Sequence, residues 1–283
     1  MTTVVQEESV AAAPAWEDAA GLLAALTSRP DTPRVADLRT RVRTAMERPY
    51  TAHVWPARID DRYLPEPLAV RNARALALKL SGMPTDLWAG QLLAGSLTLE
   101  EPRVHYERGF PDYTTPDERA AAAALGLGIT SVFGHIVPDY PRLLTRGLRG
   151  IMAGAEAQRP ACTTPAESAF LDSVVLACGA VIDLAARLAD RCDGEAAQAP
   201  DAARAAELTQ MAANLRQAPA GPARTFWQAL QAVWLVHMVF HASMNGNALG
   251  RLDQYAWPYL RADLAAGALT LAQAAELTDC FTL

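Results

Sequence analysis

Polar residues of several chemical kinds are concentrated in residues 241–260, between two apolar stretches of the sequence. An Asn-Gly dipeptide at 245–246 is typical of a turn. Gly250 permits a positive φ or a close backbone approach beside the permanently charged Arg251. Arg251 and Asp253 could bind a substrate carboxylate, or could pair with each other. We favour a buried ion pair, because a buried guanidinium needs a partner. The mixture of residues predicts a polar network buried near a binding site.

Two histidines, His237 and His241, lie four residues apart and would share one face of a helix. That spacing is compatible with metal binding. However, Met238 follows His237, so the HExxH pattern is absent, and no third ligand is close in the sequence. We therefore expect no metal site and interpret His237 as a structural histidine packed beside Trp234.

Four segments, taken in their order along the chain, resemble the large domain of glycyl radical enzymes, the pyruvate formate-lyase-like family. Together they cover roughly residues 35–283. The residues that carry the resemblance are Pro67 to Ala73, Met83-Pro84 and Gly90 to Gly95; Phe110 to Tyr113; Gly134 to Tyr140, with Leu144, Gly147, Leu148, Gly150 and Ile151; and Pro222, Ala223, Thr225, Phe226, Trp227, Ala229, Leu230 and Gln231, followed by Asn245, Gly246, Gly250, Arg251, Asp253, Gln254, Tyr255 and Pro258.

The resemblance implies which residues of this chain contact a substrate. His135 lies in a segment that borders the substrate cavity in the family, although a lone histidine is as readily a structural residue. The other candidates are Asn245, Asn247 and Arg251. Asn247-Ala248 differs from the His-Ser that follows Asn-Gly in dehydratase branches of the family, so dehydratase-type substrate binding is not implied.

The resemblance also implies a fold and a chemistry. The fold would be mainly α with a few short strands, as the N-terminal part of the family's α/β barrel. A family enzyme uses a cysteine thiyl radical to cleave a C–C, C–O, C–N or C–S bond of a small polar substrate. It carries no bound cofactor, and a separate S-adenosylmethionine iron–sulfur activating enzyme installs the radical. A homodimer is a further expectation.

Neither radical-bearing element of the family is evident in this sequence. Cys280 is followed by Phe281 and Thr282, whereas the family's active-site cysteine is followed by x-Glu. We therefore assign no catalytic residue and expect the chain to be inactive alone. Because Leu283 falls inside an apolar helical pattern with no cap, we expect the domain to continue beyond it. The alternative is a degenerate or split-gene helical fragment that acts as a non-catalytic module.

Composition narrows the classes of partner and compartment. The chain has 283 residues, a net charge of −6 and a pI of about 5.4, which argues against nucleic-acid binding. We expect no membrane span, because no uninterrupted apolar stretch approaches about 20 residues. The N-terminus lacks the basic region of a secretory signal, and the four cysteines show no CxxC spacing. A cytoplasmic protein with reduced thiols is expected.

Periodicity and breakers divide the chain into elements. Residues 1–15 are expected to be a disordered lead-in, and residues 16–283 the N-terminal part of the pyruvate formate-lyase-like domain, truncated at its C-terminal end. Strand is expected near 92–97 and 129–133, and residues 102–114 read as a loop. Thr270 is a predicted N-cap with Gln273 as its capping-box partner. Helices are predicted at 17–27, 34–48, 66–81, 117–125, 139–156, 166–192, 201–216, 224–242 and from 270 onward.

Overall fold

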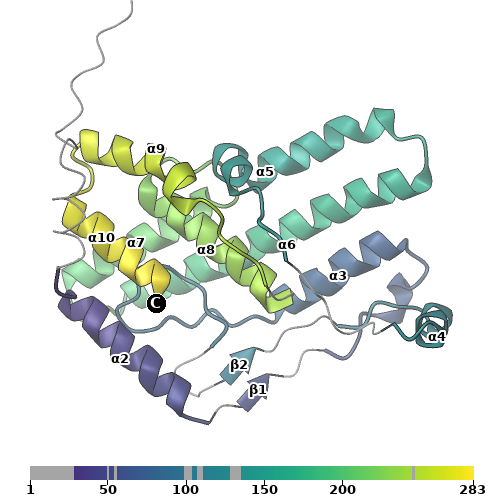
Figure 1. The fold of residues 1–283 in the computed structure, drawn as a ribbon, viewed down its shortest axis with the longest axis horizontal. Helices are drawn as coiled ribbons and strands as arrows, with labels where there is room; N and C mark the ends of the chain where they lie inside the picture. Colours follow the sequence, from purple (N-terminus) through teal and green to yellow (C-terminus); the bar gives the residue numbers. More distant parts are fainter. Residues whose placement is uncertain are drawn as a thin grey trace, which may run out of the picture.

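The computed structural model describes residues 29–49, 51–53, 56–98, 104–106, 111–127, 135–243 and 246–283. Within these residues the chain is mainly α-helical, as expected (Figure 1). The elements are α2 (Pro33–Glu47), β1 (Thr51–His53), η1 (Asp61–Tyr63), α3 (Leu68–Ser81), β2 (Val104–Tyr106), α4 (Pro116–Ala124), α5 (Tyr140–Gln158), η2 (Arg159–Ala161), α6 (Pro165–Ala196), α7 (Ala202–Gln217), α8 (Phe226–Ser243), α9 (Leu252–Ala265) and α10 (Leu271–Thr282).

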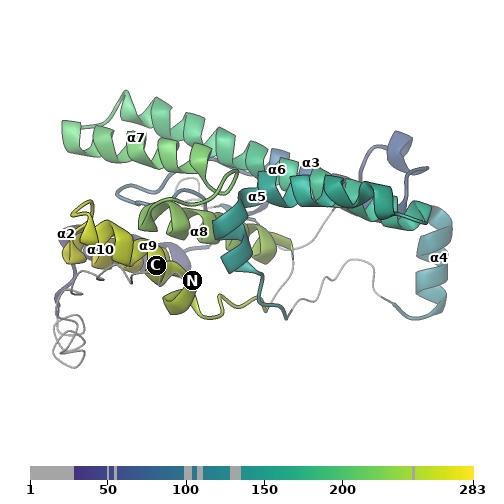
Figure 2. The ribbon, with the colours of Figure 1, turned by 90° about the horizontal axis from the view of Figure 1, so that it is seen from above.

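The helices form layers around α8. Helices α3, α5, α6 and α7 pack together on one side of α8, and α2, α9 and α10 lie on its other side (Figure 2). Helix α8 is apolar on nearly every face because it contacts α5, α6, α7, α9 and α10. Val233 and Leu235 at its centre are fully buried. Helix α8 is therefore the central element of the helical packing.

Local capping chemistry sets the helix boundaries close to where the sequence predicts them. Capping boxes start α4, with Thr115 and Glu118, and α6, with Thr164 and Glu167. The Thr270 capping box that begins α10 is confirmed. In each case a threonine hydroxyl and a side-chain carbonyl or carboxylate satisfy amides that no helical carbonyl can reach. The predicted lead-in at 1–15 and helix at 17–27 lie outside the described residues.

Of the two expected strands, the one at 92–97 does not form, and the one at 129–133 lies outside the described residues. Residues 92–97 have irregular backbone with bends at Leu92, Leu93 and Leu97. Instead, β1 and β2 pair in parallel, with Thr51 opposite Val104. Strand β2 falls in the stretch that the sequence led us to interpret as loop, because its three residues are too few to show a period of two.

Side chains of α8 replace the missing strand partner of the segment at 92–95. Trp227 Nε1 donates to Leu92 O at 2.8 Å, and Trp234 Nε1 donates to Gly95 O at 2.9 Å. Between them, the Gln231 amide accepts from Ala94 N at 2.8 Å and donates to Ala94 O at 3.0 Å. Positions 227, 231 and 234 follow an i, i+4, i+7 spacing and thus share one face of α8. We call these three residues the α8 ladder.

Helix α5 contains a kink at Gly147, whose φ of 65° and ψ of 169° are accessible only to glycine. The kink frees amides that would bond within a straight helix. Leu148 N donates to Pro219 O at 2.8 Å, and Ala223 N in turn donates to Leu144 O at 2.9 Å. The loop that leads into α8 is thus fixed against α5.

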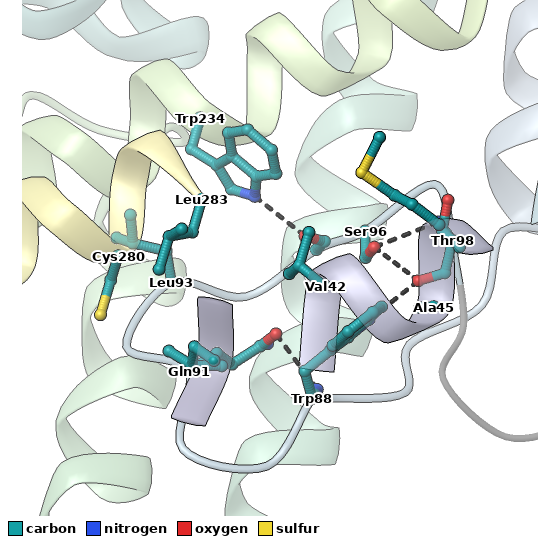
Figure 3. Close-up of a pocket in the computed structure, with 13 residues that line it drawn as sticks. Val42, Ala45, Trp88, Gln91, Leu93, Ser96, Thr98, Trp234, Cys280 and Leu283 are labelled. Carbon is teal, nitrogen blue, oxygen red and sulfur yellow. Dashed lines mark hydrogen bonds between the residues drawn. The ribbon is translucent and has the colours of Figure 1, made fainter. Parts of the chain in front are cut away.

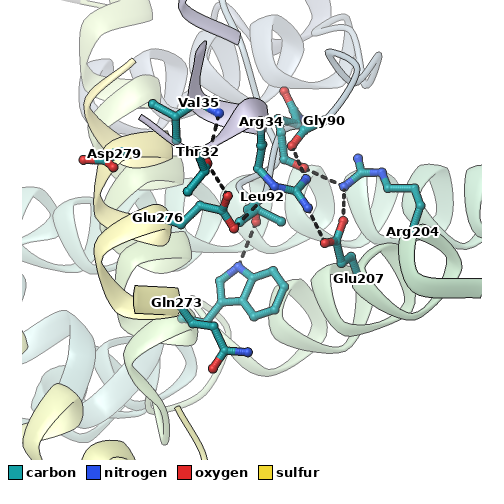
Figure 4. Close-up of polar contacts among 12 residues, drawn as sticks. Thr32, Arg34, Val35, Gly90, Leu92, Arg204, Glu207, Gln273, Glu276 and Asp279 are labelled. Atoms are coloured by element: carbon teal, nitrogen blue, oxygen red, sulfur yellow. Dashed lines mark hydrogen bonds and ion pairs between the residues drawn. The ribbon is translucent and has the colours of Figure 1, made fainter. Parts of the chain in front are cut away.

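Polar contacts anchor α2 to the rest of the fold (Figure 4). Arg34 on α2 donates to Gly90 O at 2.6 Å and pairs with Glu207 on α7. Its Nε lies 3.5 Å from a carboxylate oxygen of Glu276 on α10. Because Arg34 is only 21% exposed, these partners offset the cost of desolvating its charge. Helices α2, α7 and α10 therefore meet at one guanidinium.

Among the described residues, one helix, α6, is long and apolar enough to cross a membrane when judged by length and composition, although we expected no such segment. Only 28% of the most apolar 18-residue stretch of α6 is buried, and Phe170 is 61% exposed. The same helix packs on α3, α5 and α7. Length and apolarity alone are weak evidence for a membrane span, because core helices share both properties.

The α8 ladder makes a prediction about stability. Gln231→Leu should lower the free energy of unfolding by about 2–4 kcal/mol, because it leaves the buried amide and carbonyl of Ala94 without partners. Urea denaturation measures the change. Gln254→Leu on α9, where the glutamine is exposed, is the control and should change stability by less than about 0.5 kcal/mol. Equal effects of the two substitutions would contradict the assignment.

The kink makes a second prediction. A Cβ at Gly147 would lie 2.3 Å from the Gly221 carbonyl carbon, in a backbone conformation that other residues avoid. Gly147→Ala should therefore destabilise the fold by about 3–5 kcal/mol. Gly154→Ala, in the same helix with no atom within 4 Å of the new Cβ, should be neutral or stabilising by up to about 1 kcal/mol. Thermal or urea unfolding that ranks the two variants in the opposite order would contradict this reading of the kink.

Candidate functional site

Two segments that the sequence analysis singled out lie against each other. Ala248 N donates to Ile136 O at 3.0 Å. Gly250 has a φ of 68°, and a Cβ there would lie 2.7 Å from Val137 Cγ1. Both reasons proposed for Gly250, a positive φ and a close approach, are therefore confirmed. We call this contact between residues 135–138 and 246–251 the junction.

The junction brings together three of the four predicted substrate-binding residues. His135 begins one segment and is exposed. Asn247 lies in the other segment and is half-buried, and Arg251 ends that segment with its side chain 68% exposed. Asn245, the fourth candidate, lies outside the described residues. The structure thus places His135, Asn247 and Arg251 on adjoining backbone.

The expected burial of the Arg251–Asp253 pair is wrong, although the pair itself forms. Arg251 Nε and Nη2 donate to the two Asp253 carboxylate oxygens at 2.9 and 2.7 Å. The side chains are 68% and 64% exposed, because Arg251 precedes α9 and Asp253 occupies its first turn on the solvent side. The Arg251 hydrogen bond lowers the pKa of the Asp253 carboxyl. The contact is therefore a surface ion pair that favours the start of α9.

The wider polar network expected in 241–260 is likewise not buried as a whole. Residues Leu252–Ala265 form α9, a helix that the sequence analysis did not predict, with Pro258 inside it. Of the polar groups in this helix, Gln254 is exposed, whereas Tyr255 is half-buried and donates to Leu249 O at 2.8 Å. The proline and the run of polar residues hid an amphipathic helix, in which only Ala256 is fully buried.

Tyr140 and His237 form a partly buried polar contact. The Tyr140 hydroxyl lies 2.8 Å from His237 Nδ1, and Tyr140 is fully buried. Burial, with a smaller contribution from His241, lowers the pKa of His237 to about 4, and burial raises the pKa of Tyr140. Both groups are neutral near pH 7, so the contact is a hydrogen bond between a neutral hydroxyl and a neutral imidazole, whose direction depends on the histidine tautomer.

The two α8 histidines do not form a metal centre with other described residues. Their rings are in edge contact with centroids 4.5 Å apart. No group of three or more His, Cys, Asp or Glu side chains with metal-binding geometry occurs in the part of the chain that the structure describes. His237 is half-buried and contacts Tyr140 and His241.

Lys79 is a buried residue near the site that sequence reasoning missed. Its Nζ donates to Ala242 O near the end of α8, and its side chain is fully buried. Burial lowers the pKa of Lys79 to about 7. The amine thus supports the carbonyl end of α8 immediately before the junction segment. Lys79 is the only lysine in the chain, but nothing in the sequence identifies its partner.

A second charged residue, Arg71, joins two further motif segments. Its guanidinium is 3% exposed and donates to the backbone carbonyls of Glu66 and Tyr113 and, with both Nη atoms, to the Glu118 carboxylate. The hydrogen bond from Arg71 is the main reason that the pKa of Glu118 is lowered to about 2. Arg71 therefore fixes α4 and the Tyr113 segment to α3.

Comparison with known proteins gives consistent results. The profile of the pyruvate formate lyase-like family matches residues 67–283. Isethionate sulfite-lyase of Nitratidesulfovibrio vulgaris is 35% identical over 154 residues, which are 51% of this chain and 18% of that protein.

Two solved structures share the fold. A Roseburia inulinivorans protein studied for 1,2-propanediol dehydration has a TM-score of 0.73 at 24% identity, over 89% of this chain and 39% of its own. A glycyl radical enzyme from Archaeoglobus fulgidus has a TM-score of 0.66 at 22% identity, over 88% and 40%. The chain thus spans well under half the length of the relatives it matches.

The two arginines make a paired prediction. Arg71→Leu should reduce the free energy of unfolding by about 2–4 kcal/mol, below the range for a pair with both partners buried, since Glu118 is partly exposed. Arg251→Ala should leave the urea midpoint unchanged, because an exposed pair gains little in water. A large loss of stability in Arg251→Ala would contradict the surface assignment and restore the buried-pair interpretation.

Proposed function

This chain belongs to the pyruvate formate lyase-like family, and we propose that it is the N-terminal part of a glycyl radical enzyme. In this proposal the complete enzyme cleaves a C–C, C–O, C–N or C–S bond of a small polar substrate by thiyl-radical chemistry. The chain supplies substrate-binding groups from His135, Asn245, Asn247 and Arg251. None of its residues is assigned a catalytic role.

The junction is the observation that carries the proposal. It joins the segment of His135 to the segment of Asn247 through a backbone hydrogen bond and a glycine contact that no larger residue could make. Such a contact fixes the relative position of two polar segments far apart in the sequence, which is what a binding site requires. The side chains of His135 and Arg251 are exposed and therefore open to a ligand.

Arg251 favours a substrate with an anionic oxygen group. Asp253 occupies only Nε and Nη2 of the guanidinium, so Nη1 is directed elsewhere. A guanidinium has five N–H donors and suits planar or tetrahedral oxyanions. The relative named isethionate sulfite-lyase fits this chemistry, since its name describes the release of sulfite. We therefore place a small sulfonate or carboxylate among the substrates that Arg251 would orient.

The rest of the proposal concerns the radical-bearing residues and the activating enzyme, which are not part of this chain. The thiyl cysteine and the radical glycine would lie in sequence equivalent to the rest of the relatives' length, and a separate S-adenosylmethionine iron–sulfur enzyme would install the radical. Burial raises the pKa of Cys280 to about 11, which suits a packing role. We propose a cytoplasmic location, with homodimer formation as in the initial expectation and no nucleic-acid partner.

A chimera tests the proposal. The stretch of the Nitratidesulfovibrio vulgaris isethionate sulfite-lyase that aligns with this chain would be replaced by the chain's own residues. Activated anaerobically, the chimera should show a glycyl radical by electron paramagnetic resonance and should release sulfite. The 283-residue chain alone should show no radical under the same conditions.

Substitutions in the chimera test the binding roles. Arg251→Ala should raise KM for isethionate about tenfold to a hundredfold while the radical signal persists, because a hydrogen bond to a charged group is lost. Arg216→Ala, in another exposed ion pair on α7, is the control and should leave KM unchanged. A chimera without a radical, or an unchanged KM in Arg251→Ala and in His135→Ala, would contradict the proposal.

A further inference from the structure

Side-chain hydrogen bonds fix helix α8 at several points along its length. The α8 ladder binds it in the first half and the middle, where Figure 3 shows Trp234 donating to Gly95 O at 2.9 Å. At its C-terminal end, Lys79 Nζ of α3 donates to Ala242 O. Lys79 thus binds α8 close to the point where the chain enters residues 246–251.

The C-terminal end of α8 depends on such a donor. Carbonyls in the last turn of a helix have no partner within the helix and carry partial negative charge. Ala242 is fully buried, so water does not reach its carbonyl, and Ser243 Oγ is buried without a hydrogen-bond partner among the described residues. Helix α3 packs mainly on α6, so the long side chain of Lys79 makes the connection to α8.

The contact with Ala242 does not offset the cost of burying the amine. Burial lowers the pKa of Lys79 from the ordinary value of 10.5 to about 7, so the charged form loses more on burial than it gains from the carbonyl. Titratable side chains on the elements around it are Arg187 of α6, which donates to Leu80 O at 2.8 Å, and His241 of α8. Burial alone accounts for the lowered pKa of Lys79.

We propose that Lys79 is a positioning residue for the substrate-binding segment of the junction, and that it acts by fixing the carbonyl end of α8. The inference rests on the proposed function, because Asn247 is the binding group that Lys79 would place. The neighbouring Ala248 amide donates to Ile136 O, so a shift of the α8 end disturbs that bond. An amine buried at a net cost to stability indicates a role in position rather than in stability.

Two methionine variants of the 283-residue chain test the proposal. Lys79→Met keeps a side chain of similar length but removes the donor. Leu80→Met, at the next buried position of α3, is the control, because it conserves volume and removes no polar contact. Amide hydrogen exchange followed by nuclear magnetic resonance should show the Ala248 amide exchanging at least about fivefold faster in Lys79→Met, through local opening, and at the parent rate in Leu80→Met.

Global stability should change in the opposite direction. Below pH 7 the amine is protonated in both the folded and the unfolded chain, so the cost of its burial is complete. Above pH 7 the folded chain releases the proton, and the cost falls as the pH rises toward the unfolded pKa. The urea midpoint of Lys79→Met should therefore exceed that of the parent at pH 6, and by a smaller margin at pH 9. An equal gain at both pH values would contradict the burial of the amine on which the proposal depends.

The isethionate sulfite-lyase chimera tests the link to substrate binding. Lys79→Met should raise KM for isethionate about tenfold and change kcat by less than about twofold, because Lys79 acts on the position of a binding group. Leu80→Met should leave both constants unchanged.

Four outcomes would overturn the proposal. They are an unchanged Ala248 exchange rate in folded Lys79→Met, equal acceleration in Leu80→Met, a lower urea midpoint with faster exchange at Val233 as well, and faster Ala248 exchange with an unchanged KM. A parent chimera without a radical would instead contradict the proposed function. The exchange and urea measurements on the 283-residue chain judge the Lys79 contact independently of that result.

Discussion

Buried backbone groups in irregular segments must find hydrogen-bond partners, and this constraint organises the fold. The segment at 92–95 passes through the interior without a neighbouring strand, so the α8 ladder supplies its partners from Trp227, Gln231 and Trp234. The kink of α5 and the loop before α8 exchange backbone hydrogen bonds for the same reason. Helix α8 is central because it provides both the apolar core and these polar side chains. The position of the junction follows from it, since α8 leads directly into residues 246–251.

The motif segments that mark the family are therefore mainly places where elements are joined. The Trp227 and Gln231 motif binds the segment at 92–95, and Arg71 binds the carbonyl of Tyr113. Val137, which lies in the motif at 134–140, packs against Gly250, where a Cβ would be too close to it. His135 and Arg251 have exposed side chains, and half-buried Asn247 lies on the same junction. The exposure of His135 and Arg251 leaves both side chains accessible to the ligand that we propose for them.

The sequence predicted helices well and burial poorly. Periodicity and threonine caps located α2 to α8 and α10 within a few residues, because those signals are local. Strand was wrongly expected at 92–97, since a short apolar run looks the same in sequence whether it forms a strand or irregular backbone that side chains of a helix bind. Burial of Arg251 and Asp253 was wrong because the faces of α9 depend on tertiary packing. The candidate site was predicted as a set of residues, but only the structure shows that the segments of His135 and Asn247 touch. Lys79 was overlooked because a lone charge in an apolar pattern says nothing of its partner.

Amide hydrogen exchange at Ala94, followed by nuclear magnetic resonance, tests the central claim most directly. The claim is that the α8 ladder protects the segment at 92–95 from local opening as well as backbone hydrogen bonds protect the core helices. If so, the Ala94 amide should exchange only through global unfolding, as slowly as the amide of Val233 in the middle of α8. Exchange of Ala94 at the rate of an exposed loop amide, while Val233 remains protected, would contradict the account.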